Sequence, residues 1–555
     1  MLDTNYPLSI FKNTHFRLYT FFFLLTLLFY WDTRDAGFVT DFLGWQYTFD
    51  NYSFAQVIHA SDRGIKSFYH LTHLQMYAMS SLFGTWGLPW FLLFTALFAL
   101  NGLLIFTFSK KLLGILSIKN SFEVVLVGVL CFLLSPYQAE VMVWRASFHY
   151  LTAFAMMLGC LHFLLLYLQN PNRKYVIWTA ILFTSSCFAL EFFFITPLLL
   201  ATLILFWQLS FPKIVDFKKT AVRFVGIPLS ILGFYLVSYH WVYGKWIAHY
   251  GAGAHNKIFT TESFATYTKY VVKYLFFVRY YENSFKNKVF QIFDTPSVSW
   301  AIFIGILAFF AFGLFFFKKM SARSKLVFFN AACFSLLIMP VMTLFFATGA
   351  LTENDRYGYM ASAFLFMGLS LVFAHFGKIV LRVFTAIYLG FTVFFLVKTT
   401  HLWFKAERTF TNLVKDYRWW DADEVLVLNA PEDIAGMYMF RIYGAESAVP
   451  EALESFRRRK VPFKIYDTQR YHLTDWRNGV HVRAHTPDSL TVSLNEFGTW
   501  WSREPNYETP QYIVREGVGN YTLKLKPTAK KRVLIFQVEA GWKEVDLTKI
   551  GVEQR

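Results

Sequence analysis

The sequence has few cysteines and few charged residues for its length of 555. Its four cysteines, Cys131, Cys160, Cys187 and Cys333, all lie in apolar stretches. This distribution offers neither a disulfide framework nor the ligand spacing of a metal site. Charged residues make up only 16% of the chain, whereas soluble globular proteins have about 25%. The composition therefore excludes an ordinary soluble protein.

Apolar and aromatic residues take the place of the missing charges. Hydrophobic residues make up 55% of the chain, and 66 residues are phenylalanine. This balance predicts a polytopic membrane protein that carries some soluble mass. The net charge is +17, but the residues from 405 onward hold 23 Lys and Arg against 21 Asp and Glu. The positive excess therefore belongs to the membrane half, where the positive-inside rule explains it, and no nucleic-acid partner is expected.

Apolar runs predict about 11 transmembrane helices within residues 1–404. A membrane-spanning helix needs about 20 mostly apolar residues. The first run follows Lys12 and Arg17 but lacks a small-residue cleavage site, so we predict an uncleaved helix rather than a signal peptide. The two runs around Glu191 can also be read as one hairpin with a short polar tip. The predicted spans are 16–31, 87–108, 122–138, 148–168, 175–190, 192–210, 222–242, 299–317, 326–347, 359–376 and 383–403.

Charges between these runs predict one orientation, with a cytoplasmic N-terminus and an extracytoplasmic C-terminal region. Almost every connection on the predicted inner side is basic. These basic residues are Lys110, Lys111, Lys119, Arg173, Lys174, Lys213, Lys218, Lys219, Arg223, Lys318, Lys319, Arg323, Lys325, Lys378 and Arg382. Most acidic residues lie on the outer side: Asp32, Asp35, Asp41, Asp50, Asp62, Glu140, Glu191, Glu262, Glu282, Asp294, Glu353 and Asp355.

Two predicted outer loops are long. Near the C-terminus, strand-like segments replace the long apolar runs. Loop 32–86 contains the amphipathic segment "FYHLTHLQMYAMSSLFG", and loop 243–298 interleaves Lys269, Lys273 and Arg279 with aromatic residues. Either loop could rest on lipid headgroups, or the second could be a surface helix with an apolar underside. Residues 415–555 contain "DEVLVLNAP", "SLTVSL", "QYIVRE", "NYTLKLKP" and "RVLIFQVE", which predict a small β-rich extracytoplasmic domain.

Four segments resemble motifs of GT-C glycosyltransferases. They are "DAGFVTDFLGW", "FYHLTHLQMYAMSSLFG", "SPYQAEVMVW" and "NDRYGYMASAF". In particular they resemble the protein O-mannosyltransferase branch that has transmembrane and TPR regions. The third segment is similar to "HPVHTEAVAW", and the fourth is similar to "ERYLYLPSVGF". The likeness covers roughly residues 10 to 375.

The chain also departs from that family pattern. Phe42 follows Asp41 where the family often has a second acid, and Tyr69 or His70 stands near the arginine of the family's "YRPLT". Phe148 stands where an arginine is expected, although Arg145 lies nearby. There is no TPR tail. The resemblance therefore implies a GT-C-like fold and reaction, but it does not transfer the sugar or the acceptor.

The resemblance implies transfer of a sugar from a polyprenyl-phosphate carrier to an acceptor hydroxyl on the outer face. The resemblance leaves three classes of acceptor open: a protein, a lipid or a glycan. A hydroxyl is a poor nucleophile until a base takes its proton, and a carboxylate at the water-facing end of the membrane domain can be that base. Asp41 matches the position of the family's catalytic acid and is our first candidate. Asp35 is the second.

The lipid phosphate that leaves needs cationic donors at the headgroup level. An arginine can hold two phosphate oxygens through its planar guanidinium. Arg356 beside Tyr357 is the first candidate, followed by Arg145 and His149, with Arg279 as a further one. The carrier's tail would lie in a groove between aromatic-rich helices.

Glu140, Glu191, Asp355 and His70 are supporting candidates, and each has a structural alternative. Glu140 and Arg145 could simply pair at a helix end. Asp355 could be a salt-bridge partner of Arg356. Glu191 is costly at membrane depth, which favours a functional role there, but an exposed tip would remove that argument.

We expect no soluble cofactor. The clustered aspartates could bind Mg²⁺ or Mn²⁺, but nothing fixes a ligand geometry, and we predict no essential metal. Three other functions stay open: a transporter or flippase of lipid-linked glycans, a glycan polymerase or ligase of another membrane fold, and a receptor. The layout indicates an integral protein of a bacterial inner membrane.

Overall fold

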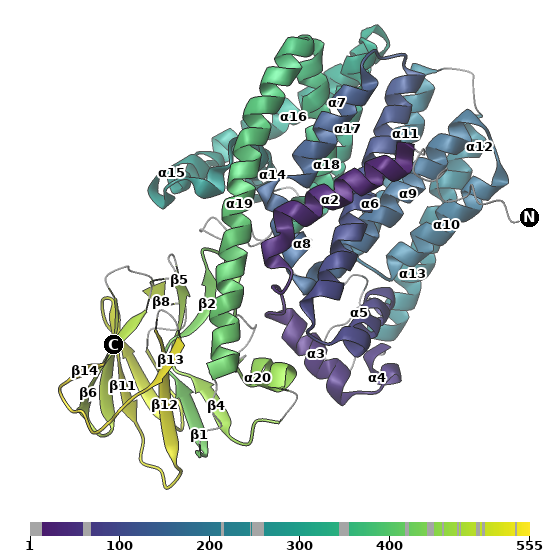
Figure 1. Cartoon of the computed structure of the whole chain (residues 1–555). Helices are drawn as coiled ribbons and strands as arrows, with labels where there is room; N and C mark the ends of the chain where they lie inside the picture. Colours follow the sequence, from purple (N-terminus) through teal and green to yellow (C-terminus); the bar gives the residue numbers. More distant parts are fainter. Residues whose placement is uncertain are drawn as a thin grey trace, which may run out of the picture.

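The chain folds into a bundle of helices followed by a smaller β-rich region, as the computed structural model in Figure 1 shows. This agrees with the predicted order of a helical membrane part and a C-terminal β part. The structure describes residues 14–58, 68–211, 216–244, 246, 260–342, 355–416, 421–440, 449–457, 460–473, 477, 479–495, 500–501, 506–538 and 541–554.

Among the described residues, eight helices are long and apolar enough to span a membrane, or nine if one bent pair is a single span. The predicted number of eleven is not confirmed, because two of the predicted spans form helices of only 17 and 15 residues, α2 and α10. The helices of the bundle are α2 (Thr14–Tyr30), α6 (Gly87–Ile115), α7 (Ser121–Leu133), α9 (Phe148–Gln169), α10 (Arg173–Cys187), α11 (Thr196–Ser210), α12 (Phe217–Ala221), η6 (Val222–Gly226), α13 (Ile227–Tyr243), α16 (Pro296–Phe316), α17 (Ala322–Ile338), α18 (Asp355–His375) and α19 (Lys378–Asp416).

Helix α18 lies inside the bundle, whereas α16 lies on its surface. Small residues such as Gly358, Ala361 and Gly368 let neighbouring helices approach α18 closely. Helix α16 is rich in phenylalanine, isoleucine and leucine, and most of these side chains point away from the protein. A bilayer would cover that surface.

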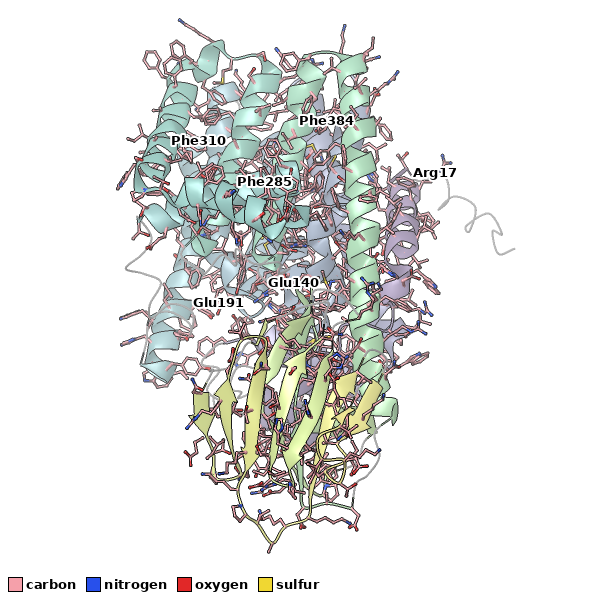
Figure 2. The ribbon with its side chains drawn as sticks, turned by 90° about the vertical axis from the view of Figure 1, so that its left-hand side faces the viewer. Arg17, Glu140, Glu191, Phe285, Phe310 and Phe384 are labelled. Atoms are coloured by element: carbon pink, nitrogen blue, oxygen red, sulfur yellow. The ribbon has the colours of Figure 1, made fainter. Side chains whose placement is uncertain are left out.

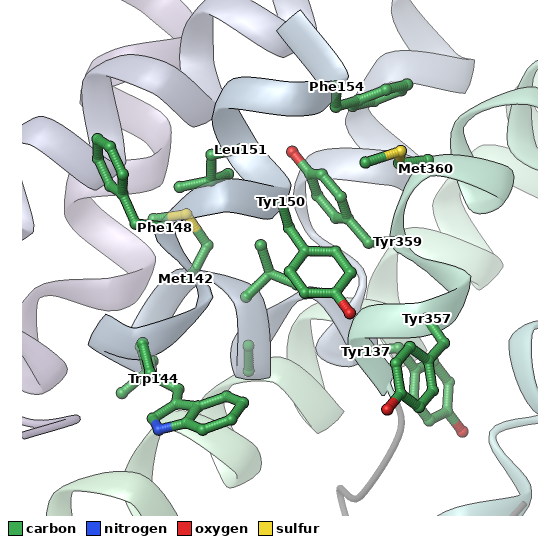
Figure 3. Close-up of a cluster of buried hydrophobic side chains, with 14 of the residues drawn as sticks. Tyr137, Met142, Trp144, Phe148, Tyr150, Leu151, Phe154, Tyr357, Tyr359 and Met360 are labelled. Carbon is green, nitrogen blue, oxygen red and sulfur yellow. The ribbon is translucent and has the colours of Figure 1, made fainter. Parts of the chain in front are cut away.

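An aromatic cluster fills the centre of the bundle beside α18. Figure 3 shows Tyr359 in this cluster with Phe154 near it. The Tyr359 ring also contacts Phe98 and Phe132, and its hydroxyl accepts a hydrogen bond of 3.0 Å from Asn101 Nδ2. A buried tyrosine usually has such a partner, so this polar pair helps to fix how α6 and α18 pack.

Short elements connect the long helices, and both long loops predicted from the sequence contain helices. The amphipathic segment "FYHLTHLQMYAMSSLFG" contains the whole of α5. These elements are η1 (Trp31–Thr33), α3 (Asp41–Asn51), α4 (Phe54–Ile58), α5 (His70–Phe83), η3 (Pro136–Gln138), α8 (Ala139–Val143), η4 (Arg145–Ser147), η5 (Glu191–Ile195), α14 (Thr261–Phe276), η8 (Val278–Tyr280), α15 (Asn283–Asp294), η9 (Phe317–Lys319) and η10 (Met339–Val341).

The described residues of the C-terminal region form three sheets, and the five strand-like sequence segments named above contain β1, β7, β10, β11 and β12. In the first sheet, β1 pairs in parallel with both β12 and β4, and β13 adds an antiparallel edge. The second sheet is antiparallel, in the order β14-β6-β7-β11-β10-β9, and the third has the order β3-β2-β5-β8. The elements are β1 (Glu424–Val427), β2 (Ala430–Ile434), β3 (Met437–Tyr438), α20 (Val449–Arg457), β4 (Lys464–Asp467), β5 (Arg470–Leu473), β6 (Val480–Thr486), β7 (Ser489–Leu494), β8 (Trp500–Trp501), β9 (Asn506–Glu508), β10 (Tyr512–Glu516), β11 (Asn520–Leu525), β12 (Arg532–Val538), β13 (Gly541–Glu544) and β14 (Glu553–Gln554).

The β-rich region lies at the end of the bundle that carries α3, α4 and α5 (Figure 1). Helix α19 continues beyond its predicted end at residue 403 and reaches Asp416. Close to α20, Lys460 donates a 3.1 Å hydrogen bond to Asn51 Oδ1 and places its charge over the Tyr47 ring. The first loop is therefore held between the bundle and the C-terminal region.

Candidate functional site

Two fully buried carboxylates mark the candidate site, and the first is Glu140. It lies in α8, where the chain bends by 54° after α7. The Arg356 guanidinium donates to Glu140 Oε1 at 2.5 Å, and the Arg356 backbone N–H donates to Oε2 at 2.8 Å. Figure 2 shows Glu140 near the end of the bundle that faces the β-rich region. Glu140 thus pairs with Arg356, whereas one sequence interpretation paired it with Arg145.

The second carboxylate is Asp355, the first residue of α18. It forms ion pairs with Lys273 from α14 and with Arg279 from η8. The sequence alternative gave Asp355 to Arg356. In the structure Asp355 pairs with two cations from the second long loop, and Arg356 pairs with Glu140.

Helix α14 is not a surface helix with its basic residues in water. Its residues Lys269 and Lys273 are both buried, at 5% and 6% exposure. Lys269 pairs with Asp294 at 2.5 Å, and Lys273 pairs with Asp355. Burial lowers the pKa of Lys273, although the attraction of Asp355 opposes this effect. The basic face of α14 therefore points into the protein.

We define the ionic cluster as Glu140, Lys273, Arg279, Asp355 and Arg356. Its three cations and two carboxylates leave one positive charge in excess. Buried charge is costly unless it is paired and hydrogen-bonded. Among the residues that the structure describes, Arg279 Nη1 and Tyr274 Oη are buried without a hydrogen-bond partner. Buried donors of this kind call for an explanation, and an anionic ligand would supply one.

Aromatic rings enclose the ionic cluster. The Arg356 guanidinium carbon lies 5.0 Å from the centre of the Trp144 ring and 4.6 Å from that of Tyr357. The Tyr137 ring contacts both Arg279 and Lys273, at 4.7 and 5.0 Å. Figure 3 shows the three rings around the start of α18. Cation–π contacts of this kind stabilise a charge that lacks water.

An apolar groove of about 640 Å³ lies next to the ionic cluster. Phe277 lies in its wall and stacks on Tyr137 with ring centres 6.5 Å apart, and Tyr388 in the same wall donates to the backbone carbonyl of Tyr274. The volume is that of a pocket for a small ligand. The groove is lined by Leu275, Phe276, Phe277, Tyr281, Phe373, Ile379, Val380, Val383, Phe384, Ile387, Tyr388, Phe391 and Phe395.

Asp41 is the first residue of α3, and its side chain is exposed. Thr40 before it has φ +54° and ψ −122°, which a β-branched residue adopts only at a cost. The backbone carbonyl of Val39 accepts a 3.2 Å hydrogen bond from Trp144 Nε1. Because the Trp144 ring also covers Arg356, this bond joins the Asp41 loop to the wall of the ionic cluster. Strained backbone held in this way is common at functional sites.

Asp35 is also exposed, and it forms a 3.4 Å salt bridge with Arg34. The resemblance to GT-C enzymes predicts that Asp41 faces a cavity that opens toward lipid. The groove described above is lined by residues of α14, α18 and α19 together with Phe277 and Tyr281, and none comes from the first loop. The structure therefore separates the exposed acids from the groove.

Arg145 fastens the first loop to the bundle. It is fully buried, and its Nη2 donates to the backbone carbonyls of Thr33 and Arg34 at 3.2 and 3.1 Å. Its backbone N–H donates to the carbonyl of Gly37 at 3.1 Å. Gly37 has φ +92°, and an added Cβ would overlap the carbonyl of Val143. Arg145 therefore supports the loop that carries Asp35 and Asp41.

Glu191 lies in a second cluster of polar side chains, at the end of the bundle that faces the β-rich region (Figure 2). Glu191 begins η5 between α10 and α11, is half-buried, and accepts a hydrogen bond from Tyr69 Oη. The Tyr69 ring stacks on His149 with centres 6.2 Å apart. Glu191 is therefore not at an exposed hairpin tip.

The predicted histidines have different surroundings. His149 is half-buried beside Tyr69, whereas His70 packs between the rings of Phe68 and Phe188, at 5.6 and 5.8 Å. His73, which the sequence did not single out, lies next to Trp45, and burial lowers its pKa to about 4.

The sequence interpretation missed Lys273 as part of the site. The available signal was the spacing of Lys269 and Lys273 by four residues in the tyrosine-rich run "YTKYVVKYLFFVRYY", which puts both on one helix face. Within the described part of the chain, no group of three or more His, Cys, Asp or Glu side chains could hold a metal ion. No family model matches the sequence, and no curated protein matches it.

Proposed function

We propose that this protein is a membrane glycosyltransferase that moves a sugar from a polyprenyl-phosphate carrier to an acceptor hydroxyl. The motif resemblance suggests this reaction. The observation that carries the proposal is a buried ionic cluster with one positive charge in excess, which the stacked rings of Tyr137 and Phe277 connect to an apolar groove. A lipid phosphate has a charged head and an apolar tail, and this pair of surfaces complements both parts.

In this reaction the acceptor oxygen forms a bond to the anomeric carbon of the sugar. The bond between that carbon and the phosphate oxygen breaks, and its electron pair stays on the phosphate. The growing negative charge needs fixed cations, which are most effective where water is excluded. Arg279, Lys273 and Arg356 are the proposed partners of the phosphate.

Asp41 is the proposed base for the acceptor proton. Its exposure leaves it accessible to an acceptor that arrives from water. The bond between Val39 and Trp144 holds its loop at the wall of the ionic cluster. Asp35 is the second proposed base in the same loop. In this proposal the site faces the extracytoplasmic side of a bacterial inner membrane.

The test is transfer of a labelled sugar from a polyprenyl phosphate by purified full-length protein in lipid nanodiscs. Asp41→Asn should reduce turnover by about 10²-fold or more, since general acid–base catalysis contributes about 10²- to 10⁴-fold. Asp32→Asn is the matched control, because Asp32 is also an exposed first-loop acid. Equal turnover of folded wild type and Asp41→Asn would exclude Asp41 as the base.

A transporter of lipid-linked glycans is the second candidate. Burial of Glu140 and Asp355 inside the bundle favours it, because transporters keep charged groups there. The two functions differ in one measurement. A transporter carries the labelled lipid across a liposome membrane without forming a glycosylated product, whereas the transferase forms the product.

A further inference from the structure

Helix α19 carries a lysine within the segment that is apolar enough to span a membrane. This candidate span, Lys378–Asn412, has no charged residue from Val383 to Val397, and Lys398 is the first charge after that run. Lys398 also lies inside the span 383–403 that the sequence predicts. A charged side chain in such a segment is costly, which favours a functional role for it.

Distance along α19 places Lys398 at a membrane surface. Lys378 and Lys398 are 20 positions apart on this one helix, which at 1.5 Å per residue is about 30 Å. The hydrocarbon core of a bilayer is also about 30 Å thick. With Lys378 on the inner side, as the distribution of charges predicts, Lys398 lies at the level of the outer headgroups.

The apolar groove ends beside Lys398. Its lining residues on α19 run from Ile379 to Phe395. The Phe395 ring stacks on Tyr280 with centres 4.1 Å apart, and the Lys398 ammonium lies 5.8 Å from the centre of the same Tyr280 ring. Because residues three apart on a helix are neighbours, Lys398 continues the groove face of α19 one turn beyond Phe395.

The charge of Lys398 is accessible to a ligand. The side chain is exposed, and within the described part of the chain its contact is the Tyr280 ring, with no carboxylate at ion-pair distance. Arg382, nearer the other end of the groove, instead pairs with Glu123 at 2.8 Å. An ammonium at one end of an apolar groove complements a lipid that has an anionic head.

Both ends of the groove have an exposed lysine, Lys378 and Lys398. Two observations favour Lys398 for the charged head. Its ammonium contacts the ring that stacks on the groove wall, and Arg279 of the ionic cluster directly precedes that ring's residue, Tyr280, in η8. A phosphate at Lys398 therefore lies at the end of the groove where η8 leads to the ionic cluster.

The length of the groove favours one kind of lipid. From Ile379 to Phe395 the groove follows about 24 Å of helix. One leaflet contributes only about half of the 30 Å core, so the acyl chains of an ordinary phospholipid reach about 15 Å. A tail that fills the whole groove must be longer than that.

We propose that Lys398 binds the phosphate of a long-chain lipid whose tail lies in the groove, from Phe395 at the head end to Ile379. That this lipid is the polyprenyl-phosphate carrier rests on the proposed function. No bond is made or broken at Lys398, so it is a binding residue, and it gives the carrier both an entry point and a direction in the groove.

Photo-crosslinking tests the direction. Full-length protein in nanodiscs receives undecaprenyl phosphate with a diazirine either next to the phosphate or about 24 Å along the tail, the length of the groove. Mass spectrometry identifies the labelled peptides. The head probe should label residues 395–402 and the tail probe residues 376–384. The reverse distribution, or labelling mainly of the exposed face of α16, would overturn the proposal.

Phosphatidylglycerol with a diazirine in its acyl chain is the control for tail length. It should label residues 376–384 less than the long-chain tail probe does. Equal labelling of these residues by both lipids would mean a site for ordinary phospholipids, and it would contradict the argument from groove length.

Charge variants at the two ends of the groove test Lys398, read as competition of undecaprenyl phosphate with the head probe. Lys398→Met should weaken binding about fivefold, since one lysine near anionic lipid contributes that much. Lys398→Glu should weaken it further, and Lys398→Arg should bind like the wild type. Lys378→Met is the matched control and should leave binding unchanged. Equal binding by the wild type and Lys398→Glu would exclude Lys398 as the phosphate partner.

Two further ligands identify what is recognised. Uncharged undecaprenol should compete equally well in the wild type and in Lys398→Met, because it lacks the phosphate. Inorganic phosphate that competes as well as the lipid would mean a soluble anion site and would contradict binding from the bilayer. If the lipid binds at Lys398 but no sugar is transferred, the proposed function fails while this inference stands. If sugar is transferred but the Lys398 variants bind normally, this inference fails alone.

Discussion

Arg356 contacts Glu140 twice, through its guanidinium and through its backbone N–H. These residues are 216 positions apart, and both are buried. The first contact pairs two charges, and the second fixes the start of α18 against α8. Trp144 lies over the same guanidinium and also donates a hydrogen bond to the backbone carbonyl of Val39. Trp144 therefore links the Arg356–Glu140 pair to the first loop.

Removing one partner of this pair should destabilise the fold strongly. Glu140→Gln leaves the Arg356 charge buried without its counter-ion, which should lower the free energy of unfolding by about 3–5 kcal/mol. The double variant Glu140→Gln, Arg356→Gln should lose less than the sum of the single variants. Chemical unfolding in detergent micelles measures both effects.

The exposed ion pair between Glu123 and Arg382 is the matched control. It has a similar distance of 2.8 Å, but the Arg382 side chain is 68% exposed. Water and salt screen such a pair, so Glu123→Gln should change stability little. A loss as large as that of Glu140→Gln would contradict the argument from burial.

Gly358→Ala should disturb the ionic cluster from the side of α18. An added Cβ would overlap Tyr274 Oη, and overpacking of this kind costs about 1–3 kcal/mol. Tyr274→Phe in the same chain should recover part of the loss, because it removes the overlapping oxygen. Gly390→Ala on α19 is the control, since nothing lies within 4 Å of its added Cβ. Thermal unfolding of the three variants and the wild type makes the comparison, and equal effects of the two alanines would exclude a clash.

Arg145→Lys should loosen the first loop while it keeps the charge. A lysine lacks the planar fork with which Arg145 reaches the carbonyls of Met142, Thr33 and Arg34. We expect faster amide hydrogen exchange in residues 33–41 and lower transfer activity, since Asp41 is the last residue of this segment. Arg34→Lys is the control, because the described side-chain partners of Arg34 are its chain neighbours Trp31 and Asp35. Unchanged exchange in Arg145→Lys would remove its proposed supporting role.

Stability should rise between about pH 8 and pH 10.5 through Lys286. Burial lowers the pKa of Lys286 on α15 to about 8 in the folded protein, whereas in an unfolded chain it stays near 10.4. Between these values the unfolded state binds more protons, so raising the pH favours folding.

The comparison of wild type with Lys286→Met isolates this effect. Thermal unfolding at several pH values should show the rise in the wild type and a smaller rise in the variant. The other charged groups on α14 and α15 are Glu262, Lys269, Lys273, Glu282, Lys288 and Asp294, and all are present in both proteins. The same pH dependence in both would mean that Lys286 is not the titrating group.

The sequence by itself determined the elements whose signal is local. Apolar runs predicted the helices of the bundle, and alternation predicted strands such as β7 and β11, because hydrophobicity and its period act within a few turns or residues. It also singled out Asp355 and Arg356, which the structure buries in the ionic cluster. The predicted count of eleven spans is not confirmed, because α2 and α10 are short.

Only the tertiary structure decided which charges meet. Asp355 is next to Arg356 in the chain but pairs with Lys273 and Arg279, while Arg356 reaches back to Glu140. Neighbouring side chains on a helix point in different directions, so each finds its partner on a different packed element. The exposure of Asp41 and the burial of Lys273 have the same origin. Both depend on where loops settle against helices that are distant in the sequence, and no local pattern encodes that.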